Sequence, residues 1–268
     1  MSVKEGFDSL AAEGFLAKPN VLLFEPRPVT DELILRVHTK NMLERVRGSG
    51  YYETSLYSAG GTVQATEKVL SEEIDNALAF IGVGGHHAGR ADYWGGCFLN
   101  LMAIAIVNAR EKFGARRFAI VDTDTHHADG TREIFWGDED ILHICFCNYG
   151  RSDSETKVCL PHASNDEEFV ERLGKEVPSR IYDFKPDLLY WFCGLDTHKD
   201  SYGTGRLTES CYPRLAEVIK NAADGSCNGK LVVKIGCNAP AYVSEYVAPR
   251  ILDLLGELNS FGIVSSQT

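Results

Sequence analysis

The sequence lacks any long hydrophobic run. Within its 268 residues no segment approaches the roughly 18 uninterrupted apolar residues of a membrane span. The first residues, MSVKEGFDSLAAEGF, are acidic early and lack the apolar core of a secretory signal peptide. We therefore expect a cytoplasmic protein with no membrane partner.

Paired cysteines are absent too. None of the eight cysteines forms a CxxC motif, and several lie in apolar runs such as LHICFC, where a thiol packs as a small hydrophobic group. Reduced, buried cysteines of a cytosolic protein fit this pattern better than a disulfide framework. Cys145 and Cys147 share one face of a predicted strand, which leaves a metal role for them open.

The sequence has no excess of basic residues. Acidic residues outnumber basic ones by 38 to 27, and the formal net charge is −11. Such a protein repels nucleic acids and attracts cationic ligands. Solubility explains the charge equally well, so we exclude nucleic acid as a partner and keep a cationic small substrate as an open alternative.

No repeat, low-complexity tract or flexible linker divides the chain, and we expect one α/β domain over residues 1–268. Short runs of branched and aromatic residues predict strands buried on both faces, as in a parallel sheet. These runs are 20–25, 77–83, 117–124, 141–147, 187–193 and 231–237.

Segments with helical spacing lie between these runs, at 31–48, 98–114, 166–177, 208–225 and 248–262. Gly114 is a suitable helix stop, and Pro178 is expected to end or kink its helix. The alternation predicts an open, mostly parallel sheet with helices on both faces.

Unusual polar segments follow four of the predicted strands. They are GGHHAG (84–89), DTDTHHADG (122–130), GLDTHKD (194–200) and NAPAY (238–242). In an open parallel sheet ligands bind at the carboxyl ends of the strands, where these segments would meet. Their convergence predicts a functional site at that edge.

The second segment has the residue types of a metal site. If the strand continues through it, Asp122, Asp124 and His126 point to one face. Carboxylate and imidazole suit zinc or another borderline divalent ion, and Asp196 is the best third ligand. Three protein ligands leave a position for water, as in catalytic zinc sites. Taken alone, this segment fits a polar strand end with helix-capping aspartates as well as it fits a metal site.

His86 and His87 in the first segment would face this metal. One histidine there is usually structural, whereas an adjacent pair predicts a base that takes a proton from water and a neighbour that supports charge. Asp122 and Asp129 are carboxylates that could orient the two imidazoles. For Asp129, a turn or a helix cap is the alternative.

Together GGHHAG, GGCFLN, VDTDTHHADGT, CGLDTHKD and GRLTESCY resemble the histone deacetylase family and its bacterial and archaeal relatives. The upstream segments RVHTKNML and LYSAGGTVQAT are similar to early segments of that family. The resemblance covers roughly residues 30–240 and implies an arginase/deacetylase-like fold.

The resemblance also implies a role for each residue of the site. It implies that Asp124, His126 and Asp196 are the zinc ligands. It implies that His87 is the general base and that His86 is its electrostatic partner. Asp122 would orient His86, and Asp129 would orient His87. Arginases bind two metals through a carboxylate where this chain has Ala128, so one zinc ion per chain is expected. A potassium ion held by Asp122 and backbone carbonyls is allowed but not required.

The sequence departs from the family at the oxyanion. The family's tyrosine, which donates a hydrogen bond to the substrate carbonyl, aligns with Asn238. Asparagine donates over a shorter reach. Tyr242 is the candidate replacement, unless its ring packs under the following helix.

Two further departures concern access. Gly96 stands where the family has an aromatic residue, and the loop RSDSETKVCLP lacks the family's Phe-Pro-Gly-Thr-Gly stretch. Both favour a wider mouth and an acylated substrate other than acetyl-lysine. We predict a zinc-dependent hydrolase that removes an acyl group from an N-acylated amine. The alternatives are an esterase or thioesterase with the same site, and a zinc-holding binding or regulatory protein without turnover.

Overall fold

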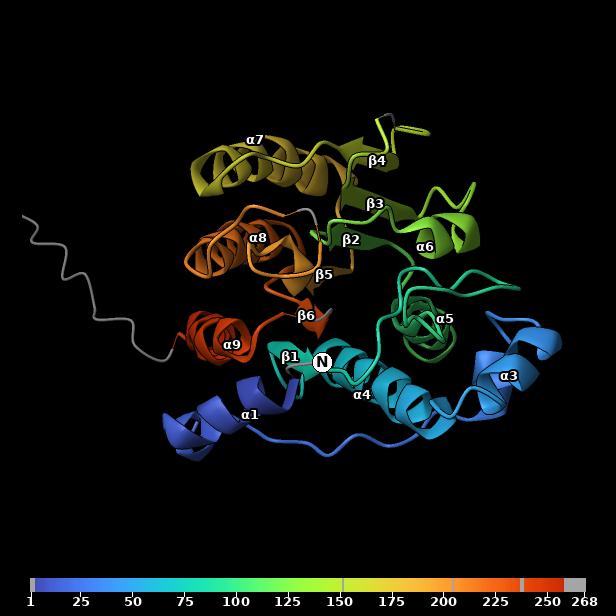
Figure 1. The fold of residues 1–268 in the computed structure, drawn as a ribbon. Coiled ribbons are helices and arrows are strands. Elements are labelled where there is room, and N and C mark those ends of the chain that lie inside the picture. Colours follow the sequence, from blue (N-terminus) through green and yellow to red (C-terminus); the bar gives the residue numbers. More distant parts are fainter. Residues whose placement is uncertain (1–2, 151, 204, 237–238, 258–268) are drawn as a thin grey trace, which may run out of the picture.

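The computed structural model describes residues 3–150, 152–203, 205–236 and 239–257. Its centre is a six-stranded parallel sheet with the order β1–β6–β5–β2–β3–β4 (Figure 1). The strands are β1 (Asn76–Phe80), β2 (Phe118–Asp122), β3 (Ile141–Phe146), β4 (Lys157–Leu160), β5 (Leu188–Gly194) and β6 (Leu231–Gly236).

Helices lie on both faces of this sheet. They are α1 (Val3–Ala12), α2 (Asp31–Ile34), α3 (Lys40–Arg47), α4 (Tyr52–Leu70), α5 (Leu101–Phe113), α6 (Asp129–Ile134), α7 (Asp166–Phe184), α8 (Cys211–Cys227) and α9 (Ala241–Gly256), with the 3-10 turns η1 (Phe15–Ala17) and η2 (Leu195–Thr197). α7, α8 and α9 cover one face, and α4 and α5 cover the other (Figure 1).

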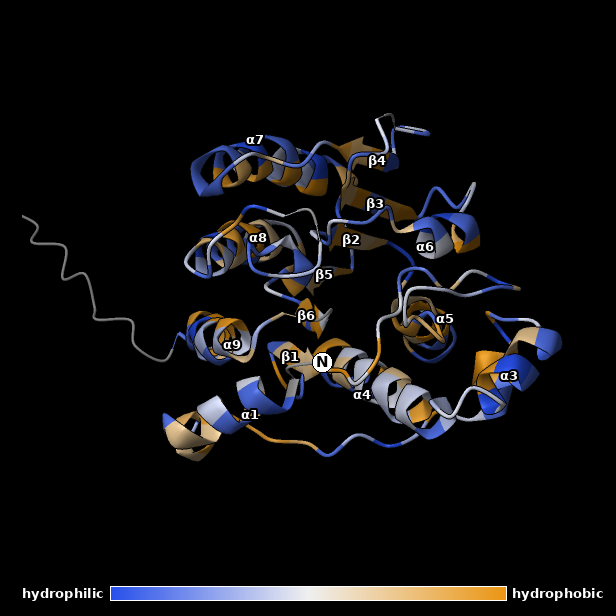
Figure 2. Cartoon of the chain, in the orientation of Figure 1, coloured by the Kyte–Doolittle hydropathy of each residue, from blue (hydrophilic) through white to orange (hydrophobic). Residues whose placement is uncertain are grey.

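These layers enclose two hydrophobic cores, because side chains alternate along each strand. In β2, Ala119 and Val121 join the core under α7, α8 and α9, whereas Phe118 and Ile120 join the core with α4 and α5. The strands are accordingly hydrophobic on both sides, while the helices also carry hydrophilic residues (Figure 2). The predicted α/β class and parallel sheet are confirmed.

Five of the six predicted strands are present, but the run 20–25 forms none. Leu22 and Leu23 are 60% and 59% exposed, and the run lines a groove beside β1. An apolar run alone does not reveal whether a hydrogen-bonding neighbour exists. The converse error is β4, which sequence analysis treated as part of a loop and which pairs with β3.

The predicted helix 31–48 is wrong as one element. It is divided into α2 and α3, because Thr39 adopts an extended backbone and its side chain accepts the Met42 N–H as a helix cap. Pro178 neither ends nor interrupts α7, which continues to Phe184. α5 ends at Gly114 as predicted. α9 begins at Ala241, before the predicted 248, and residues 258–262 of that prediction lie outside the described residues.

No helix was predicted where α4 lies, and its paired glycines are unfavourable in a helix. The backbone near Arg27 crosses α4 at Gly60. A Cβ atom on Gly60 would lie 1.5 Å from the Arg27 carbonyl oxygen. The glycine is therefore what allows the N-terminal segment to pass over the helix.

Candidate metal centre and active site

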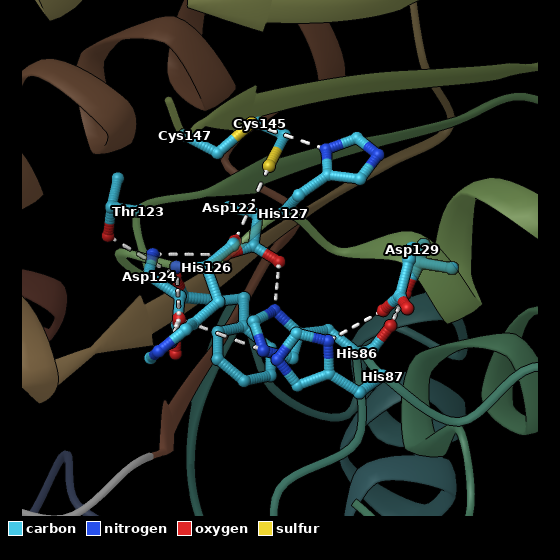
Figure 3. Close-up of polar contacts among 12 residues, drawn as sticks. His86, His87, Asp122, Thr123, Asp124, His126, His127, Asp129, Cys145 and Cys147 are labelled. Atoms are coloured by element: carbon cyan, nitrogen blue, oxygen red, sulfur yellow. Dashed lines mark hydrogen bonds and ion pairs between the residues drawn. The ribbon is translucent and has the colours of Figure 1, made fainter. Parts of the chain in front are cut away.

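The carboxyl ends of β1, β2 and β5 bring three of the four polar segments together. Segment 84–89 follows β1, and segments 122–130 and 194–200 begin at the last residues of β2 and β5. Figure 3 shows the side chains of the first two segments facing each other. Asn238, in the fourth segment, lies outside the described residues.

Asp124, His126 and Asp196 form a compact group. His126 Nδ1 lies 2.8 Å from Asp124 Oδ1 and 2.9 Å from Asp196 Oδ2. One potential ligand atom from each residue lies within 4.8 Å of the other two. Both carboxylates are fully buried, whereas the His126 side chain is 37% exposed, so the group borders solvent on the imidazole side.

The charges of this group suit a divalent cation. Burial and the nearby charge of Asp124 raise the pKa of Asp196, which indicates that the two carboxylates are held together at an electrostatic cost. Hydrogen bonds to Asp124 and Asp196 raise the pKa of His126 to about 10, so a proton on the imidazole offsets part of that cost. A divalent ion that displaces this proton would offset the cost further, and zinc accepts both ligand types.

The chain reaches this arrangement through a turn and not, as sequence analysis expected, through a continued strand. β2 ends at Asp122. The Asp124 N–H donates to Asp122 Oδ1 over 3.0 Å, and the His126 N–H donates to Asp124 Oδ1 over 2.8 Å. Each aspartate thus binds the backbone two residues ahead, as aspartates do in turns. Asp124 and His126 therefore belong to a turn and not to a strand, and Asp122 points to His86.

Gly194 sets the separation between the ends of β2 and β5. A Cβ atom there would lie 2.5 Å from Asp124 Cα and 2.7 Å from Asp124 Cβ. Real Cβ atoms do not approach carbon so closely, so the approach of Asp124 to the segment that carries Asp196 requires glycine.

Two histidine–carboxylate pairs lie beside the group. Nδ1 of His86 is 2.9 Å from Asp122 Oδ2, and Nδ1 of His87 is 2.6 Å from Asp129 Oδ1. Both pairings expected from the sequence are present. Because a carboxylate accepts, Nδ1–H donates in each pair and Nε2 carries the lone pair of a neutral ring. Nε2 of His86 lies 3.7 Å from Asp124 Oδ1, which connects its pair to the metal-ligand group.

Their surroundings shift the two imidazoles in opposite directions. Burial lowers the pKa of His86, but the charges of Asp124 and Asp122 outweigh burial and leave that pKa raised. Burial is the main cause of the lowered pKa of His87. His87 therefore favours the neutral form, which accepts a proton, and His86 favours the charged form.

Trp94 was not among the predicted site residues, yet it contacts His87. Its ring stacks on the His87 imidazole with 3.7 Å between centroids, and its Nε1–H donates to Asp129 Oδ2 over 2.8 Å. An exposed aromatic wall is therefore present even though Gly96 replaces the family's aromatic residue. The sequence offers one indication of this residue, the tryptophan in the segment DYWGGC. Only the fold shows that its ring contacts His87.

Two tyrosines, Tyr202 and Tyr242, lie close to residues of the segments that carry His126 and Asp196. The Tyr202 ring is 6.1 Å from that of His126. The Tyr242 hydroxyl donates to Asp200 Oδ2 over 2.6 Å, and its ring meets His198 edge-on at 5.6 Å between centroids. The hydroxyl is thus engaged by Asp200 on a partly exposed side chain, whereas the sequence predicted an oxyanion role for it.

Comparison with known families matches residues 48–237 to the histone deacetylase domain. The chain is 31% identical over 256 residues to a probable deacetylase of Archaeoglobus fulgidus, which covers 84% of this chain and 71% of that protein. It is 28% identical over 240 residues to a histone deacetylase-like amidohydrolase of Pseudomonas aeruginosa, which covers 77% of this chain and 63% of that protein.

The crystal structure of the HDA15 HD domain matches the fold with a TM-score of 0.85 at 21% identity, over 96% of this chain and 82% of that one. Fold and site thus define the arginase/deacetylase class of α/β proteins. Within that class the chain belongs to the histone deacetylase family and is a deacetylase-like hydrolase. Among the described residues, no helix is both long and apolar enough to cross a membrane.

Proposed function

We propose that this protein is a zinc-dependent amidohydrolase that removes the acyl group of a small N-acylated amine. The observation that carries the proposal is the convergence of Asp124, His126 and Asp196, whose ligand atoms lie within 4.8 Å of one another. The ring centroids of His87 and His126 are 5.7 Å apart. A substrate carbonyl group bound at the metal position would therefore also lie beside His87.

Asp124, His126 and Asp196 would hold the ion, which when bound supplies Lewis acidity to a carbonyl group and lowers the pKa of water. The protein's own groups move the proton. His87 Nε2 takes the proton of the attacking water and delivers it to the leaving amine. Asp129 accepts from His87 Nδ1–H and thereby fixes the tautomer that this transfer needs.

The charge of the molecule favours an amine that is cationic or carries a further cationic group. The formal net charge is −11, which attracts such substrates. The Trp94 side chain is 51% exposed beside His87, and the face of an indole ring attracts cations.

One observation favours a second substrate class. The Tyr242 hydroxyl donates to Asp200, and a missing oxyanion donor costs roughly 10²–10³ in rate. Esters and thioesters have better leaving groups than amides, so their hydrolysis tolerates a weaker donor. The same site would therefore cleave an ester or thioester faster than the matching amide.

The test measures zinc content and turnover in the same preparations, with an N-acetylated amine and the matching acetate ester as substrates. We expect turnover in the wild type, and loss of both turnover and one equivalent of zinc in Asp196→Ala. Asp200→Ala is the matched control, because it removes an exposed aspartate four residues away and should keep the zinc. Full zinc occupancy in Asp196→Ala would contradict the ligand assignment, and zinc without turnover of either substrate would indicate a zinc-holding binding protein.

A further inference from the structure

A second cluster of metal-binding side chains lies beside the turn that carries His126. His127 Nδ1 lies 3.3 Å from Cys147 Sγ and 3.6 Å from Cys159 Sγ. One ligand atom from each of these three residues lies within 4.8 Å of the others. In Figure 3 the His127 ring points away from His126 and toward Cys147. The proposed hydrolysis gives none of these three side chains a role.

The pairing of β3 with β4 builds the cluster. Cys147 directly follows β3, and its N–H donates to the Leu160 carbonyl oxygen over 2.8 Å. Cys159 lies in β4, opposite Cys145. Cys147 is buried and Cys159 is at most partly exposed, so the pairing of the strands holds both thiols in place.

Neighbouring groups orient these side chains. The Arg132 guanidinium donates to Cys159 Sγ over 3.4 Å, and its own charge is balanced by Asp153 at 2.7 Å. The pKa of both thiols is raised, so both stay protonated until a bound ion displaces their protons. The Tyr149 ring stacks on the His127 imidazole with 4.2 Å between centroids. Metal ligands are commonly held by such outer contacts.

We propose that His127, Cys147 and Cys159 bind a thiophilic divalent ion, zinc by chemical class, at a site separate from the carboxylate group. Zinc binds thiolate at about 2.3 Å and imidazole at about 2.0–2.1 Å, so tetrahedral ligands lie roughly 3.5–3.8 Å apart. The nitrogen–sulfur separations of 3.3 and 3.6 Å are close to this spacing. Two thiolates neutralise the ion, and the fourth position is left to water. The protein would then bind one metal more than the single zinc expected from the family resemblance.

Cobalt(II) distinguishes the two sites, because thiolate ligands give Co²⁺ an intense near-ultraviolet charge-transfer band and carboxylate or imidazole ligands do not. Metal-free, full-length protein with reduced cysteines is titrated with Co²⁺. We expect a band whose final intensity corresponds to one thiolate-bound cobalt ion per chain and which disappears when zinc displaces cobalt. Asp196→Ala should show the same band, since it alters only the carboxylate group.

Substitutions then assign the ligands. Cys147→Ser and Cys159→Ser should each abolish most of the band and weaken cobalt binding at this site by more than about 10-fold. Cys227→Ser is the matched control, because it removes another buried free thiol, on α8, and should leave the band unchanged. Circular dichroism shows whether each variant folds. His127→Gln retains both thiols and decides the question if a cysteine variant does not fold.

Several results would overturn the proposal. One is the absence of the band in wild-type protein whose eight thiols all react as free thiols. Another is a band that survives both Cys147→Ser and Cys159→Ser. Loss of the band in Asp196→Ala would assign it to the carboxylate group. A Cys147–Cys159 disulfide in freshly purified protein without bound metal would indicate a redox-active thiol pair instead.

Discussion

The surroundings raise the pKa of His86 and lower that of His87, so the rates that remain when each histidine is removed should differ. His87→Ala should keep the bound zinc and lower kcat by roughly 10²–10⁴, because the neutral His87 ring moves the proton. His86→Ala should be less damaging, since His86 supports charge without transferring a proton. Metal content and steady-state kinetics of both variants check this, and near-normal rates in both would remove the pair from the mechanism.

Tyr242→Phe tests the oxyanion role expected from the sequence. The Tyr242 hydroxyl donates to Asp200 and is on an exposed side chain, so its removal should cost about 1 kcal/mol or less of stability. We expect kcat to stay within a few-fold of wild type. A fall of roughly 10²–10³ would instead show that the phenol moves to the oxyanion during turnover.

How far the site could be predicted depends on how each residue is placed. Asp124, His126 and Asp196 follow strand ends, and parallel strands present those ends at one edge, so their convergence follows from sequence and topology. Trp94 is different. Its contact with His87 depends on the path of an irregular loop, which no periodicity encodes.

At the scale of elements, the errors share one cause: a helix or strand is defined by neighbours as well as by its own pattern. Residues 31–48 have helical spacing throughout, yet the Thr39 side chain starts a new helix at that point. The run 20–25 is as apolar as a strand, but it does not pair with β1. Strands 118–122 and 188–194 are central, buried on both faces, and were predicted for that reason.

α4 offers a matched pair of substitutions. Gly60→Ala places a methyl group 1.5 Å from the Arg27 carbonyl oxygen, whereas a Cβ atom on Gly61 is no closer than 3.4 Å to its neighbours. Alanine in a helix is favoured over glycine by about 1 kcal/mol. Gly61→Ala should therefore be neutral or stabilising, and Gly60→Ala clearly destabilising. Urea unfolding of both variants measures this, and equal stability would show that the crossing segment moves aside.

At the scale of the whole molecule, His38 makes stability depend on pH. Its Nδ1–H donates to the Gly89 carbonyl oxygen over 2.7 Å, and Nε2 accepts the Asn100 N–H over 3.0 Å. Burial lowers the pKa of His38 from 6.5 to about 4. Below about pH 6.5 this histidine binds a proton in the unfolded chain but stays neutral in the folded chain. The folded state therefore loses stability as the pH falls from 6.5 to about 4, by up to about 3 kcal/mol.

Unfolding by urea at neutral pH and at about pH 5 measures this loss in wild type and in His38→Gln. The variant cannot titrate at this position, so its stability should change less between the two conditions. Burial also lowers the pKa of His143, which supplies part of the remaining dependence. The same pH dependence in both proteins would remove His38 as the cause.

Gly194 has no functional group, yet any side chain there would overlap Asp124. A library that replaces every residue in turn and selects for activity would therefore rank position 194 with the ligands, although no step of the chemistry uses it. Anyone who transplants the Asp124, His126 and Asp196 arrangement into another parallel sheet has to move this glycine with it. A transplanted metal centre therefore needs the three ligand residues together with a glycine at the position of Gly194.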